Sequence, residues 1–238
     1  MNYLQLRKDF ENILQSYQAS EASQQVLKQS KIALFDGPSA SGRNTITVEL
    51  VKTGRYHQIV SDTTRLPRTN NGITEQDGVE YWFKTEREFL EGLEKGLYIE
   101  AAIIHNQQVS GVSVAEVERA HASGKIAITD IQSDGVESFL RYNADPACFF
   151  IVPPSLTVWL SRLQARGALG EDERRRRLQS AASEIEHALQ NDYYHIVVND
   201  DLQLAVQTID AFCQKQLPTS EGDRAVAETL LGDIRKIL

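Results

Sequence analysis

The residues with the clearest chemical meaning lie in one glycine-containing run that starts at residue 37. The run consists of Gly37, Pro38, Ser39, Ala40, Ser41, Gly42, Arg43, Asn44 and Thr45. Its spacing is that of a phosphate-binding loop, in which two glycines let the backbone curl so that successive N–H groups face the same phosphate oxygens. A loop of this kind binds the β-phosphate of a nucleotide, and the sequence therefore predicts a nucleotide site here.

Two residues of this run differ from the usual signature, which ends in Lys followed by Ser or Thr. Arg43 keeps the positive charge, but a planar guanidinium is not equivalent to a compact ammonium group beside a migrating phosphoryl group. Asn44 offers a carbonyl oxygen where a hydroxyl would normally meet Mg²⁺, and either Asn44 or Thr45 could act as the ligand. The run alone leaves two interpretations open, a nucleotide site and an ordinary glycine turn at the start of a helix.

A second group of residues could bind a phosphate dianion. Arg65 and Arg68 are three residues apart, and each guanidinium fork can bind phosphate oxygens in a bidentate way. Tyr81 supplies a phenol as a further donor, and a solvated basic turn is the structural alternative. The strings SDTTRLPR (61–68) and EQDGVEY (75–81) closely resemble the acceptor-binding motif of guanylate kinases, and the resemblance keeps the family's order over residues 31–212.

The resemblance implies a nucleoside-monophosphate kinase that moves the terminal phosphoryl group of ATP onto GMP or dGMP with Mg²⁺. The acceptor-phosphate ligands would be Arg65, Arg68 and Tyr81. The groups that recognise guanine would be Ser61, Glu100 and Asp130. A carboxylate can accept hydrogen bonds from N1–H and N2–H of guanine, which adenine cannot provide from that edge. As isolated residues the two carboxylates are more often ordinary strand-end groups, so their assignment depends on the resemblance.

Arginines further along the chain resemble the lid that closes these kinases over ATP. Arg166 and Arg177 fall at the lid positions, where cations would neutralise the charge on the transferred phosphoryl group. Together with Arg43 they form the predicted catalytic set. Residues 174–176 are also arginines, whose role would be limited to attracting ligand, and a solvated helix face is the alternative for the whole run 174–177. Asn199 matches a strand-end Asn that helps to hold adenine in the family, and an Asx-capped turn onto the last helix of the domain is a compatible alternative.

Two segments depart from the family's pattern. Residues 69–74 are extra, so the turn over the acceptor phosphate is expected to be longer and looser. Residues 110–112, Ser-Gly-Val, replace a Tyr-Gly-Ser or Tyr-Gly-Thr segment, which removes one phosphate-binding phenol and one base-reading hydroxyl. Two alternatives stay open. Arg43 and Asn44 leave room for a module that binds a phosphorylated peptide or nucleotide without turnover, and residues 110–112 leave room for a kinase that uses another small phosphorylated acceptor.

The elements around these residues predict a parallel α/β fold. Apolar runs predict buried strands at 31–35, 126–128, 148–152 and 196–198, and helical periodicity predicts helices at 114–122 and 156–164. The helix after the glycine run is expected to turn Ile46, Val48, Leu50 and Val51 inwards. Alternation of this kind predicts a parallel sheet with helices on both faces, and the resemblance implies the P-loop nucleoside-monophosphate kinase fold. Strands at 79–83 and 98–104 would belong to a small inserted lobe.

The predicted organisation has three parts: a helical extension (1–30), a guanylate kinase-like domain (31–212), and a linker with a C-terminal helix (213–238). The domain would divide into a core (31–59 and 113–212), an acceptor-binding lobe (60–112) and a lid at about 162–180. The first helix carries an apolar stripe from Leu6 to Tyr17, and the last carries one from Val226 to Leu238. These helices could pack on each other, cap the domain or form a dimer contact, so monomer and homodimer both stay open.

Composition and charge argue against several classes of protein. The 238 residues carry a net charge of -8, which argues against broad nucleic-acid binding. Cys148 and Cys213 lie in apolar surroundings, so we expect unpaired thiols and a reducing cytoplasm. No apolar stretch approaches the roughly 18 to 20 residues that span a bilayer, and no signal sequence begins the chain. We expect a cytoplasmic enzyme whose partners are small nucleotides and include neither membrane nor nucleic acid.

Overall fold

The computed structural model describes residues 4–70, 72–104, 106–142, 145–165, 167, 170–214 and 221–238. Its helices are α1 (Arg7–Leu14), α2 (Glu21–Gln29), α3 (Arg43–Lys52), α4 (Glu86–Glu94), α5 (Val114–Ala122), α6 (Ser133–Arg141), α7 (Leu156–Ala165), α8 (Glu171–Gln190), α9 (Leu202–Cys213) and α10 (Glu221–Ile237). Its strands are β1 (Ile32–Asp36), β2 (Tyr56–Gln58), β3 (Asp62–Thr63), β4 (Thr69–Asn70), β5 (Ile73–Thr74), β6 (Trp82–Phe83), β7 (Tyr98–Ile104), β8 (Gln108–Ser113), β9 (Ile126–Asp130), β10 (Ala147–Val152) and β11 (Tyr194–Val198).

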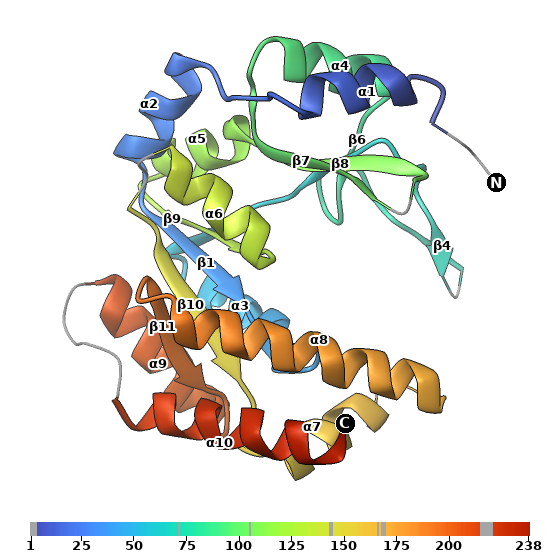
Figure 1. Ribbon diagram of the computed structural model, residues 1–238. Helices are drawn as coiled ribbons and strands as arrows, with labels where there is room; N and C mark the ends of the chain where they lie inside the picture. The colour runs from blue at the N-terminus through green and yellow to red at the C-terminus, as the bar shows by residue number, and fades with distance from the viewer. Residues whose placement is uncertain are drawn as a thin grey trace. The chain divides into compact units, whose positions relative to one another are not determined.

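The chain, coloured from the N-terminus to the C-terminus in Figure 1, divides into two compact units. Unit 1 consists of Met1–Ile32, His57–Ala127 and Glu137–Asp145. Unit 2 consists of Ala33–Tyr56, Ile128–Val136 and Pro146–Leu238. Each unit carries one of the two groups of chemically active residues, so the two groups are described separately below.

The larger sheet has the strand order β11-β10-β1-β9-β2, and β10 pairs in parallel with both β1 and β11. Every residue of β1 is buried, as expected of a strand covered on both faces. Helices flank the sheet, which confirms the predicted α/β class. The predicted strands at 126–128, 148–152 and 196–198 and the predicted helices at 114–122 and 156–164 are all present.

Unit 1 contains a smaller sheet with the order β6-β3-β8-β7 and a separate pair of strands, β4 and β5. β8 pairs antiparallel with both β3 and β7, whereas β6 is parallel to β3. Helix α4 begins with a capping box, in which the Thr85 side chain and the Glu88 side chain satisfy each other's backbone N–H groups. This cap fixes where the strand β6 gives way to the helix.

Three local predictions were wrong in detail. Val48 is 47% exposed, whereas Thr47 is buried, because successive residues of a helix turn by about 100° and position 48 therefore lies opposite Ile46. The strand expected at 79–83 is confined to β6, since a turn at Gly78, whose φ is 76°, occupies the preceding residues. The helix expected over the apolar stripe from Leu6 to Tyr17 ends at Leu14, and Ser20 then caps a second helix, α2.

Each terminal helix packs within its own unit. In unit 1, α1 lies against α4 and β7, and Phe10 is completely buried with its ring edge-to-face on Phe89, 6.2 Å between centroids. In unit 2, α10 packs on α8 and β11. Among the described residues, no helix is both long enough and apolar enough to cross a membrane.

Candidate functional site

The glycine run forms a tight loop between β1 and α3 in unit 2. Gly37 has φ 137°, and a Cβ atom there would come within 2.3 Å of the Ile151 carbonyl oxygen. Gly42 caps α3 in the left-handed conformation, with φ 104°. A side chain is excluded at both positions, because it would be strained and would also collide with neighbouring atoms. The backbone therefore follows the path that a phosphate-binding loop requires, and it ends at a helix N-terminus.

Side chains from the other elements of unit 2 hold this loop. The Trp159 indole N–H donates to the Ser39 carbonyl oxygen at 2.7 Å, and the Arg177 guanidinium donates to the Ser39 hydroxyl at 3.0 Å. The Asn199 side-chain amide donates to the Ser41 carbonyl oxygen at 2.8 Å and is buried. Ala40 adopts φ 66°, which costs an alanine about 1 kcal/mol, so the surrounding contacts must stabilise this shape.

Arg43 is held by two carboxylates at the start of α3. Its guanidinium lies 2.6 Å from an Asp130 oxygen and 3.9 Å from an Asp36 oxygen. Its side chain is only 18% exposed. A donor phosphate at the loop must therefore compete with Asp130 for this cation.

A cavity of about 270 Å³ adjoins the loop. Its lining residues are Asp36, Gly37, Ser39, Arg43, Gln132, Ser133, Asp134 and Glu184. Burial raises the pKa of the Asp36 carboxyl, although hydrogen bonds from the Tyr194 hydroxyl and the Gly37 N–H oppose the rise. Burial, followed by the negative charge of Asp36, raises the pKa of Glu184 to about 7. The lining thus combines three carboxyl groups with one guanidinium, that of Arg43, and burial makes two of these carboxyl groups, Asp36 and Glu184, harder to ionise.

The two residues predicted to meet Mg²⁺, Asn44 and Thr45, are exposed in the first turn of α3. Their carbonyl and hydroxyl oxygens are the hard ligands that Mg²⁺ prefers. Among the described residues, no group of three or more His, Cys, Asp or Glu side chains could enclose a metal. This donor set fits a cation that takes one or two protein ligands and otherwise binds phosphate oxygens.

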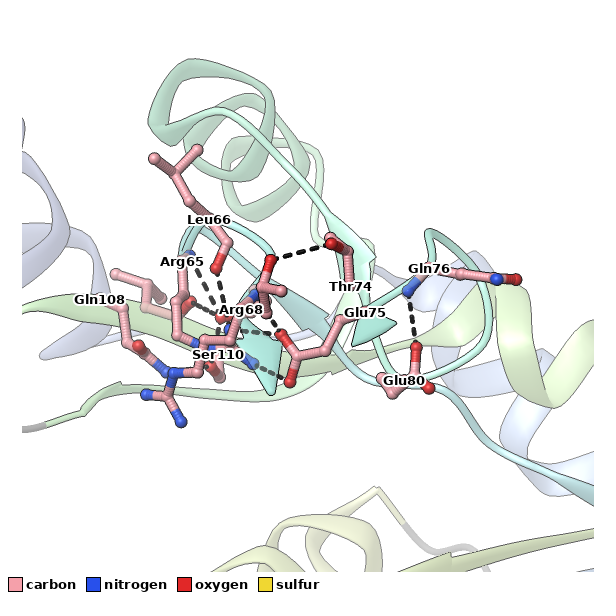
Figure 2. A network of polar contacts seen from close by, with 12 residues as sticks. Arg65, Leu66, Arg68, Thr74, Glu75, Gln76, Glu80, Gln108 and Ser110 are labelled. Atoms are coloured by element: carbon pink, nitrogen blue, oxygen red, sulfur yellow. Dashed lines mark hydrogen bonds and ion pairs between the residues drawn. The ribbon is translucent and has the colours of Figure 1, made fainter. Parts of the chain in front are cut away.

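In unit 1, Arg65 is the most highly organised cation of the predicted acceptor site. Its two terminal nitrogens donate to the two carboxylate oxygens of Glu75 at 2.6 and 3.0 Å (Figure 2). The same carboxylate accepts the Arg68 backbone N–H at 2.8 Å. Hydrogen bonding to Arg65 lowers the pKa of Glu75, and the partner bond raises the pKa of Arg65. Both groups are therefore charged at neutral pH, in a fork-to-fork pair.

Aromatic rings orient the Arg65 guanidinium further. The Tyr81 ring centroid lies 5.1 Å from the guanidinium carbon, and the Phe83 centroid lies 5.8 Å from it. The structure thus brings together Arg65 and Tyr81, as the sequence predicted, and it leaves the Arg68 side chain exposed. Arg65 and Arg68 both line a cavity of about 1070 Å³ in unit 1.

Two short strands lie among the extra residues between Arg68 and Glu75. Strands β4 and β5 pair antiparallel, and the Thr69 and Thr74 hydroxyls are hydrogen-bonded at 2.8 Å. The Glu75 N–H then donates to the Arg68 carbonyl oxygen at 2.9 Å. The insertion therefore closes at its base and returns Glu75 to the two arginines (Figure 2). The expected longer turn is present, and its base is ordered by these bonds.

The residues predicted to recognise guanine are divided between the units. Ser61 precedes β3 and Glu100 lies on β7, both half-buried in unit 1, whereas Asp130 ends β9 in unit 2 beside Arg43. Within unit 1, the departing segment lies in β8. There the Ser110 hydroxyl bonds the Thr63 hydroxyl at 2.9 Å, and Val112 is buried. Neither Ser110 nor Val112 supplies the phenol that the family has in this segment.

Of the two predicted lid arginines, only Arg177 can be placed, since Arg166 lies outside the described residues. Arg177 belongs to α8, where it also pairs with Glu173 at 2.9 Å in addition to its bond with Ser39. The preceding residues 174–176 are exposed, as a solvated helix face requires. Asp201 caps α9 by accepting the Leu204 N–H at 2.9 Å, which confirms the Asx-capped turn.

Several residues that shape these sites were not predicted from the sequence. They are Asp36, Glu75, Trp159, Arg162 and Glu184. Glu75 could have been found, because a carboxylate seven residues after an arginine pair and after a turn-forming Asn-Asn-Gly stretch is well placed to fold back. Glu184 could not, because its role depends on tertiary burial next to Asp36.

Comparisons with known proteins agree on one family. The family model described as guanylate kinase matches residues 28–216. A guanylate kinase from Corynebacterium efficiens is 33% identical over 183 residues, which is 76% of this chain and 93% of that protein. One from Helicobacter pylori is 34% identical over 179 residues, 75% of this chain and 84% of that protein. The crystal structure of guanylate kinase from Anaplasma phagocytophilum is similar with a TM-score of 0.56 and 26% identity, covering 86% of this chain and 97% of that one.

Proposed function

The chain belongs to the guanylate kinase family, and from that premise we propose that it transfers the terminal phosphoryl group of ATP to GMP or dGMP through the residues described above. As a member it is a nucleoside-monophosphate kinase with the corresponding P-loop fold. The relatives are named as kinases, so the alternative of a binding module without turnover is not favoured. Residues 60–112 would act as the acceptor-binding lobe, and residues 162–180 as the lid.

The observation that supports this proposal most directly is the bidentate pair of Arg65 and Glu75. Two oxygens of one planar anion fill the guanidinium fork, 2.6 and 3.0 Å from its nitrogens. Two oxygens of a phosphate can fill the same fork. The acceptor phosphate of GMP would then take over Arg65, with Arg68 and Tyr81 as further ligands. Glu75 keeps Arg65 extended and oriented until the acceptor arrives.

We propose that the ATP site works in the same way, with a phosphate replacing a carboxylate at an arginine. Residues 37–45 and Asn199 would form the ATP site, with the backbone N–H groups and the N-terminus of α3 around the β-phosphate. Arg43 would leave Asp130 for the phosphate oxygens, and Arg177, already beside Ser39, would meet the transferred group together with Arg166. Asp130, released from Arg43, would then be able to accept hydrogen bonds from guanine.

The proposed reaction is an in-line transfer. A phosphate oxygen of GMP forms a bond to the γ-phosphorus of ATP while the bond from that phosphorus to the β–γ bridging oxygen breaks, which yields GDP and ADP. No special general base is needed, because the acceptor oxygen is already anionic. Arg43 and Arg177 neutralise charge on the equatorial oxygens. Asn44 and Thr45 would hold Mg²⁺, which when bound supplies further charge neutralisation on the phosphates.

A coupled assay of ADP formation tests the proposal. GMP, dGMP, AMP, CMP and UMP are offered separately with ATP and Mg²⁺. We expect turnover with GMP and dGMP and little with the others. An absence of ADP production from all five acceptors would refute the enzymatic function, whereas preferential use of another acceptor would refute guanine recognition by Ser61, Glu100 and Asp130.

A further inference from the structure

The C-terminal helix α10 lies beyond the residues that match the family, which end at position 216. It is nevertheless an integral part of unit 2. Ala227, Leu230 and Ile234 are at most 1% exposed, and the helix packs along α8 and β11 (Figure 1). At its outer side, Arg235 pairs with Glu186 of α8 at 2.7 Å. Helix α10 is therefore fixed in place by both apolar and charged contacts.

The first turns of α10 contact a backbone N–H group of β11 that does not bond to the neighbouring strand. Strand β11 is at the edge of the five-stranded sheet, next to β10. The Asn199 N–H donates to the Val152 carbonyl oxygen on the β10 side at 2.8 Å. Successive N–H groups of an extended chain alternate in direction, so the Val198 N–H points away from β10. One carboxylate oxygen of Asp223 accepts that N–H at 3.2 Å.

The residue after Val198 is in direct contact with the donor loop. The Asn199 side-chain amide donates to the Ser41 carbonyl oxygen at 2.8 Å, and its nitrogen would lie 2.0 Å from a Cβ atom on Gly42. Arg162 donates to the Asn199 carbonyl oxygen at 2.9 Å. The Asn199 amide is packed directly against Ser41 and Gly42, so a shift at the end of β11 would also displace the loop.

We propose that Asp223 is a positioning residue for ATP: by holding the Val198 amide it fixes the end of β11, and Asn199 transmits that position to the phosphate-binding loop. The inference rests on the proposed function, since it presumes that residues 37–45 bind ATP. It assigns the C-terminal extension a role in donor binding, separate from the acceptor residues Arg65 and Arg68 of unit 1.

The test compares three variants of the full chain. Asp223→Ala removes the acceptor of the Val198 N–H. Asp223→Asn keeps a carbonyl oxygen that can accept the same bond. Glu228→Ala is the matched control, because Glu228 is on the same helix, is 59% exposed and has only a 3.6 Å ion pair with Arg224. The measurements are KM for ATP and for GMP, kcat, the dissociation constant of ATP by calorimetry, and Tm.

A hydrogen bond to a charged group is stronger than one between neutral groups, and only part of the effect of its loss reaches the loop. We therefore expect Asp223→Ala to raise KM and the dissociation constant for ATP roughly tenfold, with KM for GMP and kcat within about twofold of the original. Asp223→Asn and Glu228→Ala should bind ATP within about twofold of the original protein. Should Asp223→Ala fail to fold, Asp223→Ser replaces it, since a serine hydroxyl is too short to reach the Val198 amide.

Three results would overturn the inference. They are unchanged ATP affinity in Asp223→Ala, an equal loss of ATP and GMP affinity, or an Asp223→Asn variant as weak as Asp223→Ala. Unchanged ATP affinity would mean that the contact does not affect the donor site. An equal loss of ATP and GMP affinity would mean that Asp223 contributes only general stability. A weak Asp223→Asn variant would mean that the charge of Asp223 matters rather than its hydrogen bond. If the original protein binds ATP but phosphorylates no acceptor, the proposed function fails, and the calorimetric series still decides the role of Asp223.

Discussion

Two cations of the proposed active site are each paired with a carboxylate. Arg65 is paired with Glu75, and Arg43 with Asp130. An isolated, partly buried guanidinium would be costly, and its side chain would sample several rotamers. The carboxylates remove both problems, since they hold each fork in one geometry. If the proposed assignments hold, nucleotide binding at both sites exchanges one anion for another.

Arg65→Lys should weaken GMP binding severely. Lysine keeps the charge but cannot present two parallel N–H groups or stack on Tyr81, so it loses at least one charge-assisted hydrogen bond of about 1.5–3 kcal/mol. We expect KM for GMP to rise roughly 10- to 100-fold, while KM for ATP stays within about twofold. Steady-state kinetics with each substrate varied in turn measures both values.

Arg119→Lys is the matched control for that variant. Arg119 also pairs with a glutamate, Glu116, and its guanidinium carbon also lies over an aromatic ring, 4.6 Å from the Trp82 centroid. It is not among the proposed ligands, so its replacement should leave KM for GMP within about twofold of the original. If both variants lose GMP affinity to the same extent, Arg65 is a structural residue and the acceptor assignment is wrong.

The buried carboxylates near the donor loop give a second prediction, on stability and pH. The pKa of Glu184 is raised to about 7 by burial and by Asp36, so the folded protein holds a proton there that the unfolded chain releases near its ordinary value. Stability from this group is complete below the unfolded pKa and is lost as pH rises through about 7. Glu184→Gln should therefore stabilise the protein at pH 8, on the order of 1–3 kcal/mol, and have little effect near pH 4.5.

Urea unfolding at both pH values measures this difference. Glu186→Gln is the control on the same helix, because Glu186 is 46% exposed in its pair with Arg235 and should change stability by less than about 1 kcal/mol. A Glu184→Gln variant that is no more stable than the original protein at pH 8 would show that Glu184 is not held protonated by its surroundings.

At the scale of elements, periodicity and turn residues were enough to predict the main strands and helices of unit 2. They were not enough where burial is set by distant parts of the chain. Thr47 rather than Val48 faces inwards in α3, since helix rotation outweighs hydrophobicity there. Residues 79–83 are β-prone, but Gly78 turns the chain and leaves only β6 as strand. For the site, motif residues such as Arg65 and Tyr81 were found, whereas Trp159 and Glu184 act through tertiary contacts that no local pattern records.

Helix α1 supplies the element-scale prediction. The Phe10 ring is fully buried on Phe89, and Phe89 in turn stacks on Tyr98, 4.3 Å between centroids. Tyr98 begins the strand that carries Glu100. Phe10→Ala should cost about 3–5 kcal/mol of unfolding free energy and, through β7, raise KM for GMP more than KM for ATP. Denaturant unfolding and steady-state kinetics test the two parts.

An exposed apolar residue of the same unit provides the control for Phe10→Ala. Leu66 is 71% exposed but lies between the acceptor arginines, whereas Leu97 is 46% exposed and precedes β7. Leu97→Ala is therefore the better comparison, and it should cost much less stability than Phe10→Ala. Equal losses in the two variants would mean that α1 does not complete the core of unit 1.

At the scale of the whole molecule, the net charge of -8 contrasts with the local cations at each phosphate site. Anionic nucleotides are attracted only where arginines are concentrated, and the remaining surface does not compete for them. The two sites also belong to separate compact units: residues 37–45 to unit 2, and residues 61–81 to unit 1. Each ligand should therefore order its own part of the chain.

Hydrogen exchange followed by mass spectrometry tests this division. Saturating GMP alone should slow exchange in residues 61–68 and 75–81, and ATP alone should slow exchange in residues 37–45, because each ligand stabilises the segment that it contacts. Peptides covering 126–131 decide the role of Asp130. If it recognises guanine, GMP alone protects them; if it serves only to hold Arg43, ATP alone changes them, since Arg43 must leave it. Identical protection by either nucleotide in both segments would contradict the assignment of one phosphate site to each unit, because neither ligand would then act through its own cations.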